Sequence, residues 1–176
     1  MSGRDPSLEQ KRIDMLTAVG HCITSWSSVE INLICIFRDV SGTDGLADAL
    51  LTEPRGFSTR LSMIDQAVQF RLAKTSHLDD WQLLCKHASG LSSLRNQVAH
   101  ATMLNYNNAC VLQPYFGSTA AQPYLSIDDV KSRVLQFHEL ASCLDWFHST
   151  VIAPLPSPLH LGPEPDLLAR LRSRRA

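Results

Sequence analysis

The chain of 176 residues is long enough for one domain and leaves little room for a second. Apolar residues make up 44% and charged residues 19% of the sequence, which excludes a chain that is disordered throughout. Sixteen lysines and arginines face seventeen acids, and the net charge of −1 excludes a protein that binds nucleic acid through bulk charge alone. No apolar run approaches the roughly 20 residues that a membrane helix needs, so we expect no membrane partner.

The long helix predicted at the start runs from about Ser7 to about Asp39. Its apolar residues recur at alternating steps of three and four, which is typical of one face of an amphipathic helix. The residues on this face are Leu16, Val19, Ile23, Trp26, Glu30, Leu33 and Phe37. Glu30 is the charged exception on this face, and a carboxylate among apolar groups needs a partner.

Three further helices are predicted before residue 105. A short one is expected over Leu46–Leu51, and a third follows Ser58. The third helix turns its apolar residues Leu61, Ile64, Val68 and Leu72 inward. The fourth helix, from about Trp81 to about Leu104, is predicted to continue through Gly90, although glycine costs about 1 kcal/mol there relative to alanine.

A small β-hairpin is predicted before the last long helix. Its strands are expected at 110–116 and 123–125, on either side of the loop 117–122. Ser126-Ile-Asp-Asp129 is a good N-terminal cap for a fifth helix that ends near Ile152. That helix turns Val130, Val134, Phe137, Leu140, Leu144 and Phe147 inward.

The composition changes at residue 153. Five prolines within thirteen residues indicate an extended linker. The last residues, 166–176, can form a short helix that bears Arg170, Arg172, Arg174 and Arg175. We therefore divide the chain into a helical domain, 1–152, and a proline-rich linker with a basic tail, 153–176. The tail arginines are interpreted as a solvated face, with an RNA or partner contact as the alternative.

The cysteines and the start of the chain bear on compartment and metal binding. The first residues show no secretory signal, and the five cysteines lack the close spacing of a zinc or redox pair. His138-Glu139 begins like a zinc-binding helix, but Ser142 stands where the second histidine is needed. We expect reduced thiols in a cytoplasmic protein, with no metal and no cofactor.

The residues that can carry chemistry lie on the fourth helix. Helical spacing puts Arg95 on the flank of the apolar face, where it can turn inward to Glu30, while His100 points outward. The outward face is Ser92, Asn96, Ala99, His100 and Met103, which are small or amphipathic. If two chains pair there about a two-fold axis, two arginines and two histidines gather in one cleft. Such a cluster suits a phosphodiester, because arginine binds phosphate and histidine exchanges protons near neutral pH.

These residues resemble a known family. Arg95-Asn96-Gln-Val-Ala-His100 is similar to the Arg-x4-His signature of HEPN domains, the nucleotide-binding domains of higher eukaryotes and prokaryotes. Residues 26–33, with Trp26 and Glu30, resemble the first helix of many bacterial members, and the resemblance covers roughly residues 7–152. It implies an all-α bundle of about five helices, with the small hairpin described above, that forms a homodimer through the motif helix.

The resemblance also implies a function. Many members are metal-independent ribonucleases in toxin–antitoxin or phage-defence systems, so it implies an endoribonuclease whose substrate is RNA. Arg95 would bind phosphate, His100 would be the acid and base, Asn96 a polar support and Glu30 an orienting partner. An antitoxin or another regulatory protein would be a further partner, although Thr102 stands where some toxins carry a tyrosine that their antitoxin modifies.

Two alternatives stay open on the same residues. The Arg95–Glu30 pair can be a purely structural link between helices, and His100 can be a surface or interface histidine. The protein would then be a catalytically inactive HEPN-like module that binds RNA, a nucleotide or a protein partner, or a plain dimeric scaffold.

Overall fold

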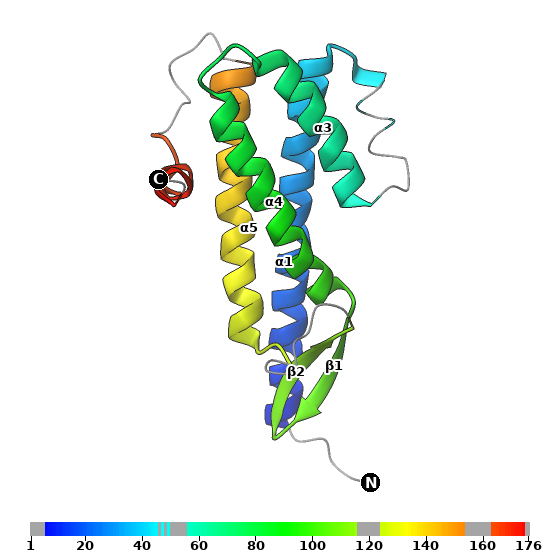
Figure 1. Cartoon of the computed structure of the whole chain (residues 1–176). Helices are drawn as coiled ribbons and strands as arrows, with labels where there is room; N and C mark the ends of the chain where they lie inside the picture. The colour runs from blue at the N-terminus through cyan, green and yellow to red at the C-terminus, as the bar shows by residue number, and fades with distance from the viewer. Residues whose placement is uncertain are drawn as a thin grey trace. The chain divides into compact units, whose positions relative to one another are not determined.

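The computed structural model describes residues 6–45, 47, 49, 56–115, 124–153 and 163–174 (Figure 1). This part of the chain is mostly helical, with five α-helices and one two-stranded antiparallel hairpin, in agreement with the predicted all-α class. The elements are α1 (Pro6–Ser41), α3 (Phe57–Leu72), α4 (Leu78–Ala99), β1 (Ala101–Tyr106), β2 (Ala109–Pro114), α5 (Ile127–Phe147), the π-helix η1 (His148–Ile152) and α6 (Asp166–Ser173). The short helix expected over 46–51 falls where only Ala47 and Ala49 are described.

Contacts divide the chain into two compact units. The first unit consists of Met1–Trp26 and Leu91–Phe137, and the second of Ser27–Gly90 and His138–Ala176. Helices α1, α4 and α5 are each divided between the two units, with one segment in the first unit and one in the second. The boundary expected between residues 152 and 153 stays a prediction, and α6 belongs to the second unit.

The core of the first unit forms around the buried ring of Trp26. This indole meets the ring of Phe137 on α5 edge to face, with centroids 5.0 Å apart. On α1 the buried apolar positions before Trp26 are Met15, Ala18 and Cys22. The stripe predicted from the sequence was wrong here, because Leu16 is 50% exposed. That stripe repeats every seven residues, and a straight α-helix drifts by about 20° per heptad against such a repeat.

The hairpin follows directly on the end of α4 (Figure 1). Strands β1 and β2 pair from Ala101 opposite Pro114 to Tyr106 opposite Ala109. Asn107 and Asn108 form the turn with positive φ angles of 49° and 59°, the conformation that two-residue hairpin turns require.

The presence of a small hairpin before the last long helix is confirmed, but the predicted pairing of its strands was wrong. The second observed strand overlaps the expected 110–116, whereas the first lies before it and takes residues that we had assigned to the fourth helix. The expected partner at 123–125 contributes one bridge, in which Leu112 and Leu125 exchange backbone hydrogen bonds of 2.9 and 2.7 Å. The Asn-Asn pair, which tolerates left-handed backbone, is the turn signal that we missed.

The predicted cap of α5 is confirmed. The hydroxyl and the backbone N–H of Ser126 both donate to the Asp129 carboxylate, at 2.6 and 2.8 Å. The Asp129 N–H in turn donates to the Ser126 hydroxyl at 3.2 Å, which completes a reciprocal capping box. The hydrogen bond from the Ser126 side chain is the main reason why the pKa of Asp129 lies below its usual value.

The core of the second unit contains the fully buried ring of Trp81. The ring lies 5.7 Å from that of Phe147, and its indole N–H donates to Asp65 at 2.9 Å. Helix α3 buries the four side chains predicted from the sequence, which are Leu61, Ile64, Val68 and Leu72. The end of α1 contributes Leu33 and Phe37, which confirms the predicted stripe in this half of the helix.

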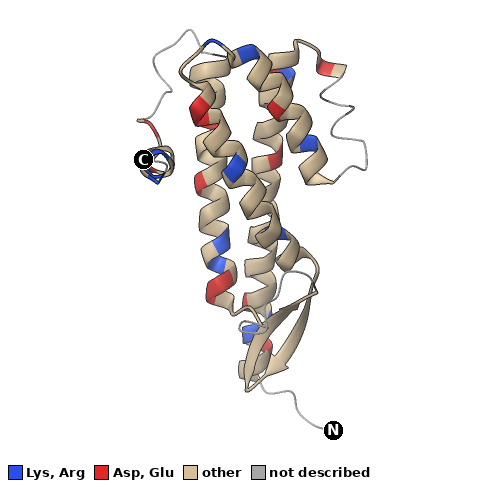
Figure 2. Cartoon of the chain, viewed as in Figure 1, with Lys and Arg blue, Asp and Glu red and all other residues tan. Residues whose placement is uncertain are grey.

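Helix α6 is held in the second unit by two buried leucines and by ion pairs. Leu167 and Leu168 are 7% and 0% exposed. Arg172 donates two hydrogen bonds of 2.7 Å to the Asp80 carboxylate, which is almost buried on α4. Arg170 pairs with Glu139 at 2.9 Å. These two arginines are therefore paired with acids of the same chain. Figure 2 shows that acidic and basic positions are interspersed along the helices.

The five cysteines are free thiols. Burial raises the pKa of Cys22 and of Cys143 to about 11, so both stay protonated and unreactive at neutral pH. Among the described residues, no helix combines the length and the hydropathy needed to cross a bilayer.

Candidate functional site

The three motif residues lie in the last part of α4, within the first unit. Arg95 and Asn96 are helical, and His100 is the residue that ends the helix. The backbone N–H of His100 still donates to the carbonyl of Asn96, at 3.1 Å. Strand β1 begins at the next residue, so the imidazole stands at the junction of helix and hairpin.

The motif side chains differ in exposure. Asn96 and His100 are exposed, and Arg95 is half-buried. Leu91 and Val98, on the opposite side of the same turns, are buried at 5% and 3% exposure and fix this end of the helix in the core. Met103, which we had placed on the outward helical face, was misassigned, because it lies on β1.

The Arg95 guanidinium lies over an aromatic ring. Its central carbon is 5.7 Å from the centroid of the Trp26 indole, within the range of a cation–π contact. Trp26 is in turn fixed by its contact with Phe137. The sequence placed Trp26 in the core but did not predict this contact, because it depends on how two distant helices pack.

Arg133 is a second arginine beside the motif, and it was not predicted from the sequence. It is only 8% exposed, and it donates to the Leu94 carbonyl at 3.0 Å and to the Gln97 side-chain oxygen at 2.8 Å. Its pKa is lowered because burial penalises the charged form. Arg133 therefore braces α4 on both sides of Arg95. The available signal was a charged residue between Val130 and Val134 in an otherwise apolar stripe.

Glu30 lies in the second unit, where it forms an ion pair with Arg60. Its carboxylate accepts a hydrogen bond from Arg60 of α3 at 2.5 Å, and both side chains are about one-fifth exposed. The sequence indicated that Glu30 needs a basic partner, but it did not single out Arg60. The expected pairing of Glu30 with Arg95 stays a prediction.

The chain matches no protein-family model, no curated protein and no solved structure. The site presents an exposed imidazole and an exposed amide one helical turn apart, with a guanidinium held nearby on the same helix. Such a set can bind an anionic oxygen and transfer a proton next to it.

Metal ions in proteins are held by groups of His, Cys, Asp and Glu side chains. The described ranges contain no group of three such side chains that could hold a metal ion. His138 is exposed on α5, and His87 of α4 is half-buried. Burial is the main reason why the pKa of His87 is lowered, and nearby Arg174 and Arg170 contribute in the same direction.

Proposed function

We propose that this protein is a metal-independent endoribonuclease of the HEPN type. The observation that carries the proposal is the placement of Arg95, Asn96 and His100 at one end of α4, with the amide and the imidazole exposed. The Arg95 guanidinium lies over the face of the Trp26 indole. Because this ring is neutral, the contact does not itself cancel the charge of the guanidinium. The resemblance of this motif to the HEPN signature is the reason why we propose metal-independent cleavage of RNA as the reaction.

The proposal includes a homodimer through α4. The exposed side of the helix near its end is formed by small or uncharged residues, among them Ser93, Asn96 and Ala99. Gly90 lies earlier on α4, which is continuous there, and a Cβ at that position would meet no atom within 4 Å. A second α4 can therefore approach closely, and a two-fold axis would bring two copies of the motif together.

The reaction follows from the properties of RNA and of the two residues. The 2′-hydroxyl attacks the adjacent phosphorus while one His100 accepts its proton. The P–O5′ bond breaks, and the second His100 of the dimer donates a proton to the leaving 5′-oxygen. Arg95 stabilises the charge that develops on the non-bridging oxygens, with Asn96 as a polar support. The products are a 2′,3′-cyclic phosphate and a 5′-hydroxyl.

We place this activity in the cytoplasm, as a toxin or phage-defence effector under the control of an antitoxin or another regulatory protein. The five free thiols support a reducing compartment. Induced expression of the wild-type chain should arrest bacterial growth, whereas a His100→Ala variant should not.

A second candidate function is an inactive module that uses the same face to bind RNA, a nucleotide or a protein. The observation that favours it is the charge of the chain, which is −1 and gives little general attraction to RNA. The two functions differ in whether a phosphodiester bond is broken, so one assay separates them.

The test is incubation of the purified protein with RNA in the presence of a chelator. We expect products that end in cyclic phosphate, and we expect Arg95→Ala and His100→Ala each to lower the rate by at least about a hundredfold. Asn96→Ala should have a smaller effect. Matched controls are Arg71→Ala and His138→Ala, which change exposed residues of the same types on other helices.

The oligomeric state is measured on the same samples. Light scattering should show a dimer, and Gly90→Leu should weaken it and lower the rate, with unchanged helical circular dichroism. Salt-dependent binding without cleavage would support the inactive module instead. A monomer that cleaves RNA as fast as the dimer would contradict the composite site.

A further inference from the structure

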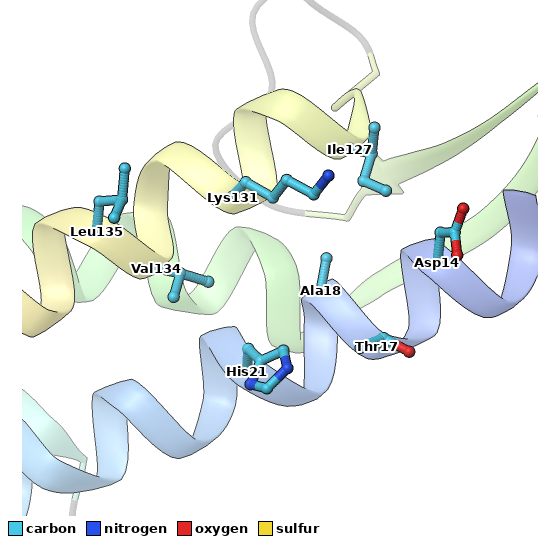
Figure 3. Close-up of a pocket in the computed structure, with 8 residues that line it drawn as sticks. All are labelled: Asp14, Thr17, Ala18, His21, Ile127, Lys131, Val134 and Leu135. Atoms are coloured by element: carbon cyan, nitrogen blue, oxygen red, sulfur yellow. The ribbon is translucent and has the colours of Figure 1, made fainter.

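The first unit contains a groove that the proposed nuclease site does not use. It lies between α1 and α5 and has a volume of about 550 Å³, which is enough for a small organic ligand (Figure 3). Its lining on α1 runs from Asp14 to His21, a length of about 10 Å at the rise of an α-helix. The groove is therefore short, and its volume is enough for a chain of several methylene groups.

The walls of the groove are mainly apolar. Ala18 forms the floor on α1, and Val134 faces it from α5, with Ile127 closing one end (Figure 3). Leu135 borders the groove on α5 and is 67% exposed, so apolar surface continues to its rim. Covering such surface with an apolar ligand is favourable because it removes apolar area from water.

Two basic side chains of the groove make no hydrogen bond or ion pair in the described part of the chain. Lys131 extends over the groove from α5, and His21 lies in it on α1 (Figure 3). Within the described part of the chain, neither the Lys131 ammonium nor the His21 ring has a hydrogen bond or an ion pair. Asp14 also lines the groove, and Gln10 donates a hydrogen bond to its carboxylate at 2.9 Å. Because an amide donor is neutral, the negative charge of Asp14 remains, and an anionic ligand must place its carboxylate away from Asp14.

We propose that this groove binds a small amphipathic carboxylate. The apolar chain packs between Ala18 and Val134, and the carboxylate is held by Lys131, with His21 as the second donor. The unpaired ammonium of Lys131 argues for an anionic group, and the length of only about two helical turns argues for a small molecule rather than a docked peptide helix. The inference is independent of the nuclease proposal.

The test uses sodium octanoate as the probe on the full chain. Titration is followed by calorimetry and by the methyl resonances of Ala18 and Val134, which should shift together and saturate. Two matched probes separate the parts of the ligand. We expect 1-octanol, which has the same chain without charge, and acetate, which has the charge without the chain, each to bind at least about tenfold more weakly.

Three exposed positions allow variants that should not disturb the fold. Lys131→Met should weaken octanoate at least about tenfold, and Asp14→Asn should strengthen it severalfold by removing the nearby negative charge. Lys86→Met, an exposed lysine of the second unit, is the control and should bind as the wild type does.

The proposal is overturned if octanoate leaves the two methyl resonances unchanged, if octanol binds equally well, or if Lys86→Met matches Lys131→Met. RNA cleavage is a separate readout, so failure here leaves the nuclease proposal untouched.

Discussion

Arg95 in the first unit and Arg172 in the second are both partly exposed, and they are held in different ways. Arg95 lies over the neutral indole of Trp26. Arg172 makes a two-pronged ion pair with the nearly buried carboxylate of Asp80. The first contact orients a guanidinium without cancelling its charge, whereas the second cancels the charge and turns it into a structural link.

The same difference recurs elsewhere in the two units. In the first, buried Arg133 bonds to a carbonyl and to an amide oxygen. In the second, Arg60 and Arg170 pair with Glu30 and Glu139. In these contacts the two arginines beside the candidate site meet neutral groups, and the arginines of the second unit meet carboxylates. A contact with a neutral partner does not itself cancel the charge of a guanidinium.

The largest expected effect is on the aromatic support of Arg95. Trp26→Ala should lower the free energy of unfolding by about 3–5 kcal/mol, because it removes a buried ring that contacts Phe137. Urea denaturation measures this. Trp26→Phe keeps a ring under the guanidinium, and we expect it to retain most of the RNA cleavage at a smaller cost in stability. A Phe variant that is stable but inactive would show that the indole does more than orient Arg95.

The next effect concerns the ion pair in the second unit. Arg172→Ala should cost about 2 kcal/mol, because it leaves the Asp80 carboxylate nearly buried without its partner. The loss should shrink in 1 M salt, and the double variant Asp80→Arg with Arg172→Asp should recover part of it. If the reversed pair is no better than either single variant, the link is not mainly electrostatic.

A smaller effect is expected at the cap of α5. Ser126→Ala should destabilise the first unit by about 1 kcal/mol, because it removes the hydroxyl that bonds to Asp129 and to its N–H. Ser126→Thr keeps that hydroxyl and serves as the control. The variant should also raise the pKa of Asp129, which an NMR titration of the carboxyl carbon can detect.

The smallest effect is the acid sensitivity of the His148–Asp39 contact, whose atoms are 2.6 Å apart. Burial works to raise the pKa of Asp39, but hydrogen bonding and the charge of His148 prevail and lower it. A lowered folded-state pKa stabilises the fold above about pH 4 and loses that contribution as the pH falls. Asp39→Asn should cost less than about 1 kcal/mol at pH 7, because the pair is partly exposed, and the difference from wild type should vanish below pH 3. Asp145→Asn, at an exposed position on α5, is the control.

Much of the fold could be predicted from the sequence where local signals decide it. Ser126 to Asp129 predicted the cap of α5, and the apolar spacing predicted the buried face of α3. The end of α4 could not be found in the same way, because Ala101 to Leu104 continues a helical pattern without a break. The signal for a strand at 101–106 is instead the turn at Asn107 and Asn108, which joins this segment to β2.

The candidate site was predictable in part for the same reason. The positions of Arg95, Asn96 and His100 on one helix follow from their spacing alone. The partners Trp26 and Arg133 come from helices far away in the chain, and Arg60 became the partner of Glu30 through the packing of α3. Spacing along one element cannot reveal contacts of this kind, although a lone charge in an apolar stripe shows that one must exist.

The junction at His100 has a consequence for local opening. A helix end usually frays, but here the last helical hydrogen bond, from His100 to Asn96, is followed at once by the ladder of β1. Fraying of α4 must therefore also strain the first rungs of the hairpin, and amide hydrogens on both sides of the junction should exchange slowly with solvent. We therefore expect the exposed imidazole of His100 to be carried by a backbone that rarely unfolds locally.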